Sequence, residues 1–134
     1  MSAAPLSAAP LNAAPRVVIL ADDLIWADRL AGAARTAGAD PVLVRSLDRF
    51  EDALASTSLA IIDLTARAYD GVDAIVRARA TGVRCLAVGQ HDDLELRKRA
   101  LAAGADRVYA YRLLFQDGGG TLSRWMSQVG GDVS

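Results

Sequence analysis

Short apolar runs alternate along this chain with longer segments in which apolar residues recur at helical spacing. The runs are rich in valine, isoleucine and leucine. Runs of this length and composition are typical of buried β-strands, and their alternation with helical segments predicts βαβ units with parallel strands. The predicted strands span residues 16–20, 41–45, 59–64, 83–88 and 107–110.

The segments between the strands carry start and stop signals for helices. Asp22 or Asp23 can cap a first helix that ends at Gly38. Trp26 falls on the apolar face of this helix, so we expect it in the core. Further helices are expected after Ser46, after Asp70-Gly71, from Asp92 or Asp93 to Gly104, and over residues 121–129.

Five strands with intervening helices predict an α/β fold, a flavodoxin-like, doubly wound three-layer sandwich. Its five-stranded parallel sheet has the strand order 2-1-3-4-5. Ligands in this architecture bind beyond the carboxyl ends of the strands, at the switch point between strands one and three. Asp22 and Asp23 follow the first strand, and Asp63 lies near the end of the third. We therefore expect these carboxylates to converge on one crevice.

The length of the chain sets its domain organisation. With 134 residues and 52% hydrophobic content, the chain can bury one sizeable core. We place this domain at residues 16–130. Residues 1–15 repeat an Ala-Ala-Pro motif with a proline every five residues, which predicts a flexible tail.

Charge and cysteine content limit the classes of partner. The net charge of -1 gives no general attraction to nucleic acid or to an anionic membrane surface. No apolar stretch approaches the roughly 20 residues needed to span a bilayer, and no secretory signal is recognised. Cys85, the only cysteine, lies in an apolar run, which favours a buried thiol in a cytoplasmic protein.

Two motifs occupy fixed places in this pattern. Asp63 stands at the end of the third strand, with Asp70-Gly71 at the start of the third helix, and residues 99–106 (RALAAGAD) lead into the fifth strand. From about residue 16 to residue 125, the chain resembles the CheY-like receiver domain of bacterial two-component response regulators. The resemblance implies that Asp63 is the phosphoacceptor and that the partner is a sensor kinase or another signalling protein.

Several functional positions of that family are occupied here by other residues. Phosphoryl transfer to an aspartate needs a metal and fixed donors around the transferring group. The family's hydroxyl residue falls on Gly89 and its lysine on Tyr111. We therefore interpret the chain as a degenerate pseudo-receiver, with no amine or hydroxyl within bonding reach of Asp63. The other departures are Ala21 for one of two acidic residues, Val108 for an aromatic switch residue and Arg112 for a proline.

The remnants of the phosphorylation site have alternative uses. No cofactor is required, and the resemblance implies at most a weakly held Mg²⁺ with Asp22, Asp23 and Asp63 as ligands. Asp23 equally suits the cap of the first helix, and Asp63 can anchor loops by hydrogen bonds without being phosphorylated. Arg112 is an alternative to the lysine because a guanidinium binds phosphate in bidentate fashion.

We expect a signalling module that acts by phosphorylation-independent protein–protein contact, with another protein or a second copy of the chain. Its surface would comprise the fourth helix, the fifth strand and the fifth helix, and residues 113–115 form an apolar run in a loop there. Two alternatives are a single-domain regulator phosphorylated on Asp63 and a small-molecule sensor whose crevice is enlarged by Gly89. The predicted surface residues are Arg97, Leu101, Tyr109, Tyr111, Leu113, Leu114 and Phe115.

An enzyme is not expected. The sequence contains no Ser-His-Asp set, no Cys/His metal spacing and no dinucleotide-binding fingerprint.

Overall fold

A computed structural model describes residues 14–90, 92–116 and 119–128 of the protein. The predicted tail therefore lies outside the described residues except for Ala14 and Pro15. Residues 129 and 130, at the end of the predicted domain, also lie outside them.

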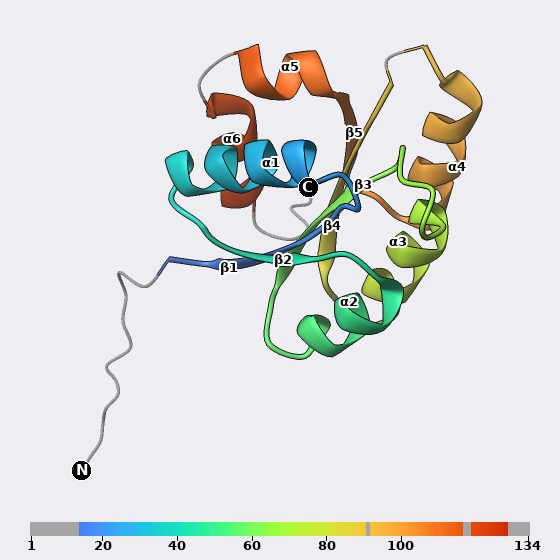
Figure 1. Ribbon diagram of the computed structural model, residues 1–134, viewed down its shortest axis with the longest axis horizontal. Coiled ribbons are helices and arrows are strands. Elements are labelled where there is room, and N and C mark those ends of the chain that lie inside the picture. The colour runs from blue at the N-terminus through green and yellow to red at the C-terminus, as the bar shows by residue number, and fades with distance from the viewer. Residues whose placement is uncertain (1–13, 91, 117–118, 129–134) are drawn as a thin grey trace.

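Five parallel strands form one sheet in the order β2-β1-β3-β4-β5, which confirms the predicted topology (Figure 1). β3 is buried throughout because helices cover both faces of the sheet. The predicted limits of β1 and β5 are correct, and those of β2, β3 and β4 are wrong by one residue. The strands are β1 (Arg16–Leu20), β2 (Asp40–Val44), β3 (Leu59–Asp63), β4 (Arg84–Gly89) and β5 (Arg107–Ala110).

The helices of the described residues divide into two groups, one on each face of the sheet (Figure 1). One core lies under α1, α5 and α6, and the other under α2, α3 and α4. No helix in the described part of the chain is both long and apolar enough to cross a membrane. The helices are α1 (Leu24–Thr36), α2 (Leu47–Leu54), α3 (Gly71–Ala80), α4 (Leu94–Ala103), α5 (Tyr111–Gln116) and α6 (Gly120–Ser127).

Polar side chains start four of these helices. Asp23, Ser46, Asp70 and Asp93 each accept hydrogen bonds from backbone N–H groups of the first turn, which otherwise have no partner inside the helix. All four are among the predicted helix starts. Asp23 therefore caps α1, which confirms one of the two roles predicted for it, helix cap or metal ligand.

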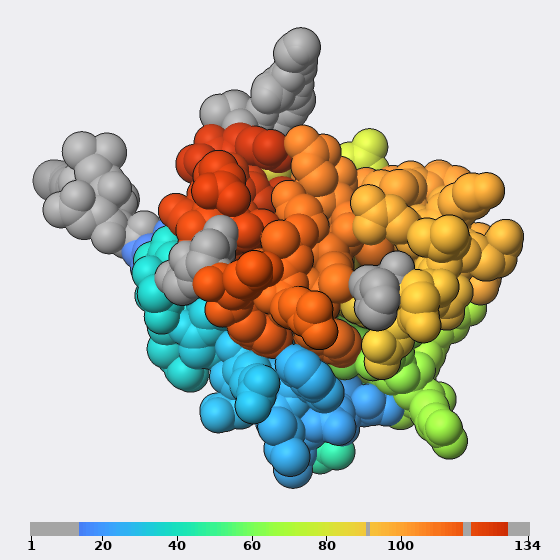
Figure 2. Space-filling view, turned by 90° about the horizontal axis from the view of Figure 1, so that it is seen from above, coloured from blue at the N-terminus to red at the C-terminus, as the bar shows by residue number. Residues whose placement is uncertain are grey.

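Helix α5 corrects the prediction that residues 113–115 lie in a loop. It begins at Tyr111, directly after β5, and it buries Tyr111 and Leu114 against the core under α1. Seen from above the carboxyl ends of the strands, α5 lies between the start of α1 and α4 (Figure 2). Six residues are too few to display a helical period, so the sequence pattern did not reveal this helix.

Arg84 ties the end of α6 to the opposite, amino-terminal edge of the sheet. Its guanidinium lies 2.9 Å from Asp106 Oδ2 and donates to the carbonyls of Trp125 (2.9 Å) and Gln128 (2.6 Å). Trp125 Nε1 donates to the same Asp106 oxygen at 3.0 Å. The Trp125 carbonyl also accepts from the Gln128 backbone N at 3.2 Å, so Arg84 adds a charged donor to the capped end of α6.

We predict that Arg84→Met lowers the free energy of unfolding by about 2–4 kcal/mol, because it leaves a largely buried carboxylate and two carbonyls without their cation. Urea unfolding measures this change. Arg99→Met is the matched control, since Arg99 has no ion pair among the described residues and is exposed. An equal loss of stability in the two variants would contradict this account of Arg84.

Candidate functional site

The carboxylate of Asp63 is buried at the end of β3. The residue is 0% exposed, and its Oδ1 accepts hydrogen bonds from the backbone N of Thr65 (2.9 Å) and from Thr65 Oγ1 (2.7 Å). Asp63 Oδ2 has no hydrogen-bond partner among the described residues. A buried polar atom without a partner costs free energy and is a common mark of a functional site.

The Thr65 hydroxyl corrects the expectation that no hydroxyl lies within reach of Asp63. It comes from the residue two positions after the acid, whereas the family pattern directs attention to the position after β4. A threonine two residues after a strand-terminal aspartate can bond back to it, and this local signal is present in the sequence.

Tyr111 reaches the same hydroxyl from α5. Its phenolic oxygen lies 3.2 Å from Thr65 Oγ1. Since Thr65 donates its single O–H to Asp63, the phenol must donate to Thr65 and remain protonated. Burial raises the pKa of Tyr111 above its usual range, and the interaction with the Asp63 carboxylate raises it further.

A stack of aromatic rings includes Tyr111, the last member of this hydrogen-bonded group. The rings of Trp26 and Tyr111 are stacked with centroids 3.9 Å apart, and Phe115 follows at 5.8 Å from Trp26. The guanidinium of Arg29 lies 5.3 Å from the Trp26 ring. Trp26 is half-buried and packs against the core, as predicted. The place expected for a lysine is therefore filled by a ring held between α1 and α5.

Asp22 lies next to Asp63 in the fold but uses its carboxylate to hold a loop. Its Oδ2 accepts from the backbone N of Arg67 (3.1 Å) and of Ala68 (3.0 Å). Asp23 is occupied as the cap of α1, with its Oδ1 bonded to Ile25 N and Trp26 N.

These contacts determine how well the site fits a metal ion. In the described part of the chain, no three His, Cys, Asp or Glu side chains are placed to hold a metal. Each of the three carboxylates predicted as Mg²⁺ ligands has one oxygen in a structural hydrogen bond, while Asp22 Oδ1, Asp23 Oδ2 and Asp63 Oδ2 have no hydrogen bond among the described residues. Because the three side chains are not brought together, the arrangement does not fit a magnesium centre that uses all three as ligands.

Tyr69 joins the ends of β1 and β3 beneath the loop. Its buried hydroxyl lies 2.9 Å from the Leu20 carbonyl and 2.8 Å from the Asp63 carbonyl, and the two carbonyls share its single O–H donor. Burial, and then the charge of Asp63, raises the pKa of Tyr69 beyond its usual range. Sequence reasoning did not single out this residue, because its partners are carbonyls that no side-chain motif marks.

The other positions that depart from the family pattern lie around this edge of the sheet. Gly89 ends β4, and an added Cβ would lie 3.6 Å from Leu64 Cβ, which is ordinary contact distance. Val108 is buried on β5, and Arg112 is exposed on α5 with no hydrogen bond to Asp63. Ala21 is buried after β1, and its methyl side chain has no atom that could bind a metal.

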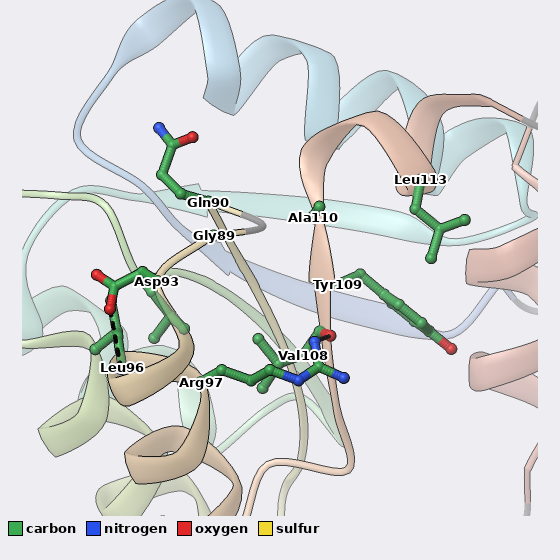
Figure 3. Close-up of a pocket in the computed structure, with 10 residues that line it drawn as sticks. Gly89, Gln90, Asp93, Leu96, Arg97, Val108, Tyr109, Ala110 and Leu113 are labelled. Atoms are coloured by element: carbon green, nitrogen blue, oxygen red, sulfur yellow. Dashed lines mark hydrogen bonds between the residues drawn. The ribbon is translucent and has the colours of Figure 1, made fainter.

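A pocket of about 240 Å³ opens between α4 and β5 (Figure 3). Gly89 and Val108 line it together with Leu64. Arg97 crosses its rim and donates to the Val108 carbonyl at 2.7 Å. Leu113 of α5 lies at the opposite end of the pocket (Figure 3).

The structure divides the predicted surface residues into two sets. Leu101 and Leu113 are 42% and 45% exposed, and Arg97 is also exposed. Tyr109 and Phe115 are half-buried. Tyr111 and Leu114 are buried, which corrects their assignment to a contact surface, because α5 turns these two side chains toward the core.

Comparison with solved structures identifies the fold. The BeF3-activated DrrB receiver domain superposes with a TM-score of 0.73 at 12% identity, covering 84% of this chain and 97% of that one. The signal receiver domain of the DNA-binding response regulator protein (merR) from Colwellia psychrerythraea 34H gives 0.73 at 19% identity, covering 85% and 99%. A response-regulator signal receiver domain from Bermanella marisrubri gives 0.71 at 19%, covering 84% and 96%.

No family model and no curated protein matches the sequence. The chain nevertheless has the fold of CheY-like response-regulator receiver domains, as the resemblance implied.

We predict that Tyr69→Phe lowers the free energy of unfolding by about 1–3 kcal/mol, because two buried carbonyls lose their donor. Tyr109→Phe is the matched control, since the described residues offer the Tyr109 hydroxyl no hydrogen-bond partner; its effect should stay within about 0.5 kcal/mol. Both values come from urea unfolding. A loss in Tyr109→Phe as large as in Tyr69→Phe would refute the assigned role.

Proposed function

We propose that this receiver-fold chain is a signal-transduction module that binds a protein partner without phosphorylation of Asp63. One observation carries the proposal. Tyr111, on which the family's lysine falls in the sequence pattern, lies with its phenolic oxygen 3.2 Å from Thr65 Oγ1 and with its ring stacked on Trp26. No enzymatic activity is proposed.

The chemistry of phosphoryl transfer supports this interpretation. The transferring group needs fixed cations and donors around its oxygens. In the family pattern, the hydroxyl position falls on Gly89 and the lysine position falls on Tyr111. Arg112 is exposed on α5 and makes no hydrogen bond to Asp63. Loss of one preorganised donor costs roughly 10² to 10³ in rate in other enzymes, so the loss of two makes transfer slow.

The partner surface that we propose is formed by α4, β5 and α5, and we refer to it as the α4–β5–α5 face. On α4, Leu94, Arg97, Lys98 and Leu101 recur at helical spacing and are all exposed. Leu113 of α5 continues this apolar surface across the pocket. Exposed leucines around a pocket are typical of protein contact sites.

The size of the pocket favours an amino-acid side chain over a metabolite. Ligand sites usually measure about 300–1,000 Å³, whereas this pocket measures about 240 Å³. Lys98 and Arg112 are exposed and have no ion pair among the described residues. The partner segment that we propose therefore carries a large apolar side chain and neighbouring acidic residues.

Titration with beryllofluoride and Mg²⁺ tests whether Asp63 can carry a phosphoryl group. We expect no saturating shifts at the amides of Asp63 and Gly89 in the NMR spectrum of the labelled protein. Saturating shifts in the wild type would overturn the proposal. The double variant Gly89→Ser/Tyr111→Lys is the positive comparison, because it restores a hydroxyl and an amine, and space exists at Gly89 for the added side chain.

Affinity capture with purified variants tests the partner surface. We expect Leu101→Asp to weaken capture of the wild-type partner by at least about tenfold, because it places a charge in an apolar contact. Leu43→Asp is the matched control, since Leu43 is 45% exposed on β2, remote from this face in the sheet order. Asp63→Asn, which cannot be phosphorylated, should capture the partner normally.

Two outcomes of the capture experiment would contradict the proposal: loss of the partner with Asp63→Asn, or equal loss with Leu43→Asp and Leu101→Asp. If the captured partner is a second copy of the chain, analytical ultracentrifugation of the same variants will show self-association that Leu101→Asp abolishes.

A further inference from the structure

We propose that Asp63 controls the α4–β5–α5 face through a hydroxyl relay, Asp63–Thr65–Tyr111, that sets the position of helix α5. This inference rests on the proposed function in one respect, namely that the α4–β5–α5 face is the contact surface. It assigns to Thr65 and Tyr111 the role of positioning residues.

The relay is continuous and has one direction. Thr65 Oγ1 donates to Asp63 Oδ1 at 2.7 Å, and the Tyr111 phenol, 3.2 Å away, donates to Thr65. The two hydrogen bonds that the Asp63 side chain accepts among the described residues come from Thr65, and the Tyr111 phenol is close enough to interact with the same carboxylate. Hydrogen bonds that end on a buried carboxylate are shorter and stronger than neutral ones, so the acid holds the whole chain of hydroxyls.

The last member of the relay belongs to the helix that forms one wall of the pocket. Tyr111 is the first residue of α5, and Leu113, which lines the pocket, is two positions later. Residues two apart on a helix project on nearly opposite sides. A shift of the Tyr111 ring toward or away from Thr65 therefore rotates Leu113 into or out of the pocket.

Helix α5 has only six residues and follows β5 without a connecting loop. Apart from the relay, it is held by the burial of Tyr111 and Leu114 and by the stacking of Phe115 on Trp26. The stack with Trp26 holds the Tyr111 ring in its plane, and the hydroxyl relay determines how far the ring extends toward the acid.

The residues between Asp63 and the pocket offer no alternative to this relay. Gly89 has no side chain that could carry a hydrogen bond from the acid, and the side chain of Val108 has no polar atom. In the described part of the chain, the one side-chain hydrogen-bond path from Asp63 toward this face passes through Thr65.

NMR of the full chain in two conservative variants tests the relay. Tyr111→Phe removes only the phenolic hydroxyl, and Thr65→Val removes only the intervening one. We expect each variant to shift the amide and methyl resonances of Leu113 and the amide of Arg97. Because both break the same relay, the double variant should shift them no further than Tyr111→Phe alone.

Two controls separate the relay from a general loss of a hydroxyl. Thr65→Ser keeps the donor and should leave Leu113 at its wild-type position. Thr81→Val makes the same substitution at the end of α3, where the hydroxyl bonds the Ala78 carbonyl, and it should not move Leu113. Unshifted Leu113 resonances in Tyr111→Phe, or additive shifts in the double variant, would overturn the relay.

The two proposals fail separately. Beryllofluoride binding by the wild type would overturn phosphorylation independence and leave the resonance shifts of the variants unaffected. Absence of those shifts would overturn the relay, while the capture experiment would still decide whether the α4–β5–α5 face binds a partner.

Discussion

The carboxyl edge of this sheet is organised by the way the protein satisfies one buried carboxylate. Asp63 is fully buried, and a charge in that position is tolerated only where donors point at it. Thr65 supplies two donors to Oδ1, and its hydroxyl also lies within hydrogen-bond distance of the Tyr111 phenol. In our proposal, the position of α5 depends on these bonds.

The neighbouring acids show how the same crevice has acquired structural functions. Asp22 fixes the loop after β3 through two backbone N–H groups, and Asp23 caps α1. Tyr69 joins β1 to β3 below them. Asp22, Asp23 and Asp63 thus each use one carboxylate oxygen within the protein, and Asp63 Oδ2 is a buried atom without a partner among the described residues.

The fold could be predicted from the sequence because strands and helices leave periodic signals. The runs at β1 and β5, the caps at Asp23 and Ser46, and the strand order could be inferred from apolar pattern and turn chemistry. Helix α5 could not be predicted, because its six residues directly continue a strand and its apolar positions also suit a loop.

The site was predictable only in part. The position of Asp63 and the substitutions Gly89 and Tyr111 were readable by comparison with a family pattern. The bond from Tyr111 to Thr65 was not, because it joins residues 46 positions apart whose approach depends on the packing of α5 on α1. Such contacts arise from tertiary packing, which leaves no local signal in a single sequence.

Intact-mass spectrometry after incubation with a small phosphodonor such as phosphoramidate, with the non-acceptor variant Asp63→Asn as the blank, tests the central claim most directly. The account predicts that wild-type protein and blank keep the same mass. A wild-type population heavier by one phosphoryl group and absent from the blank would contradict it.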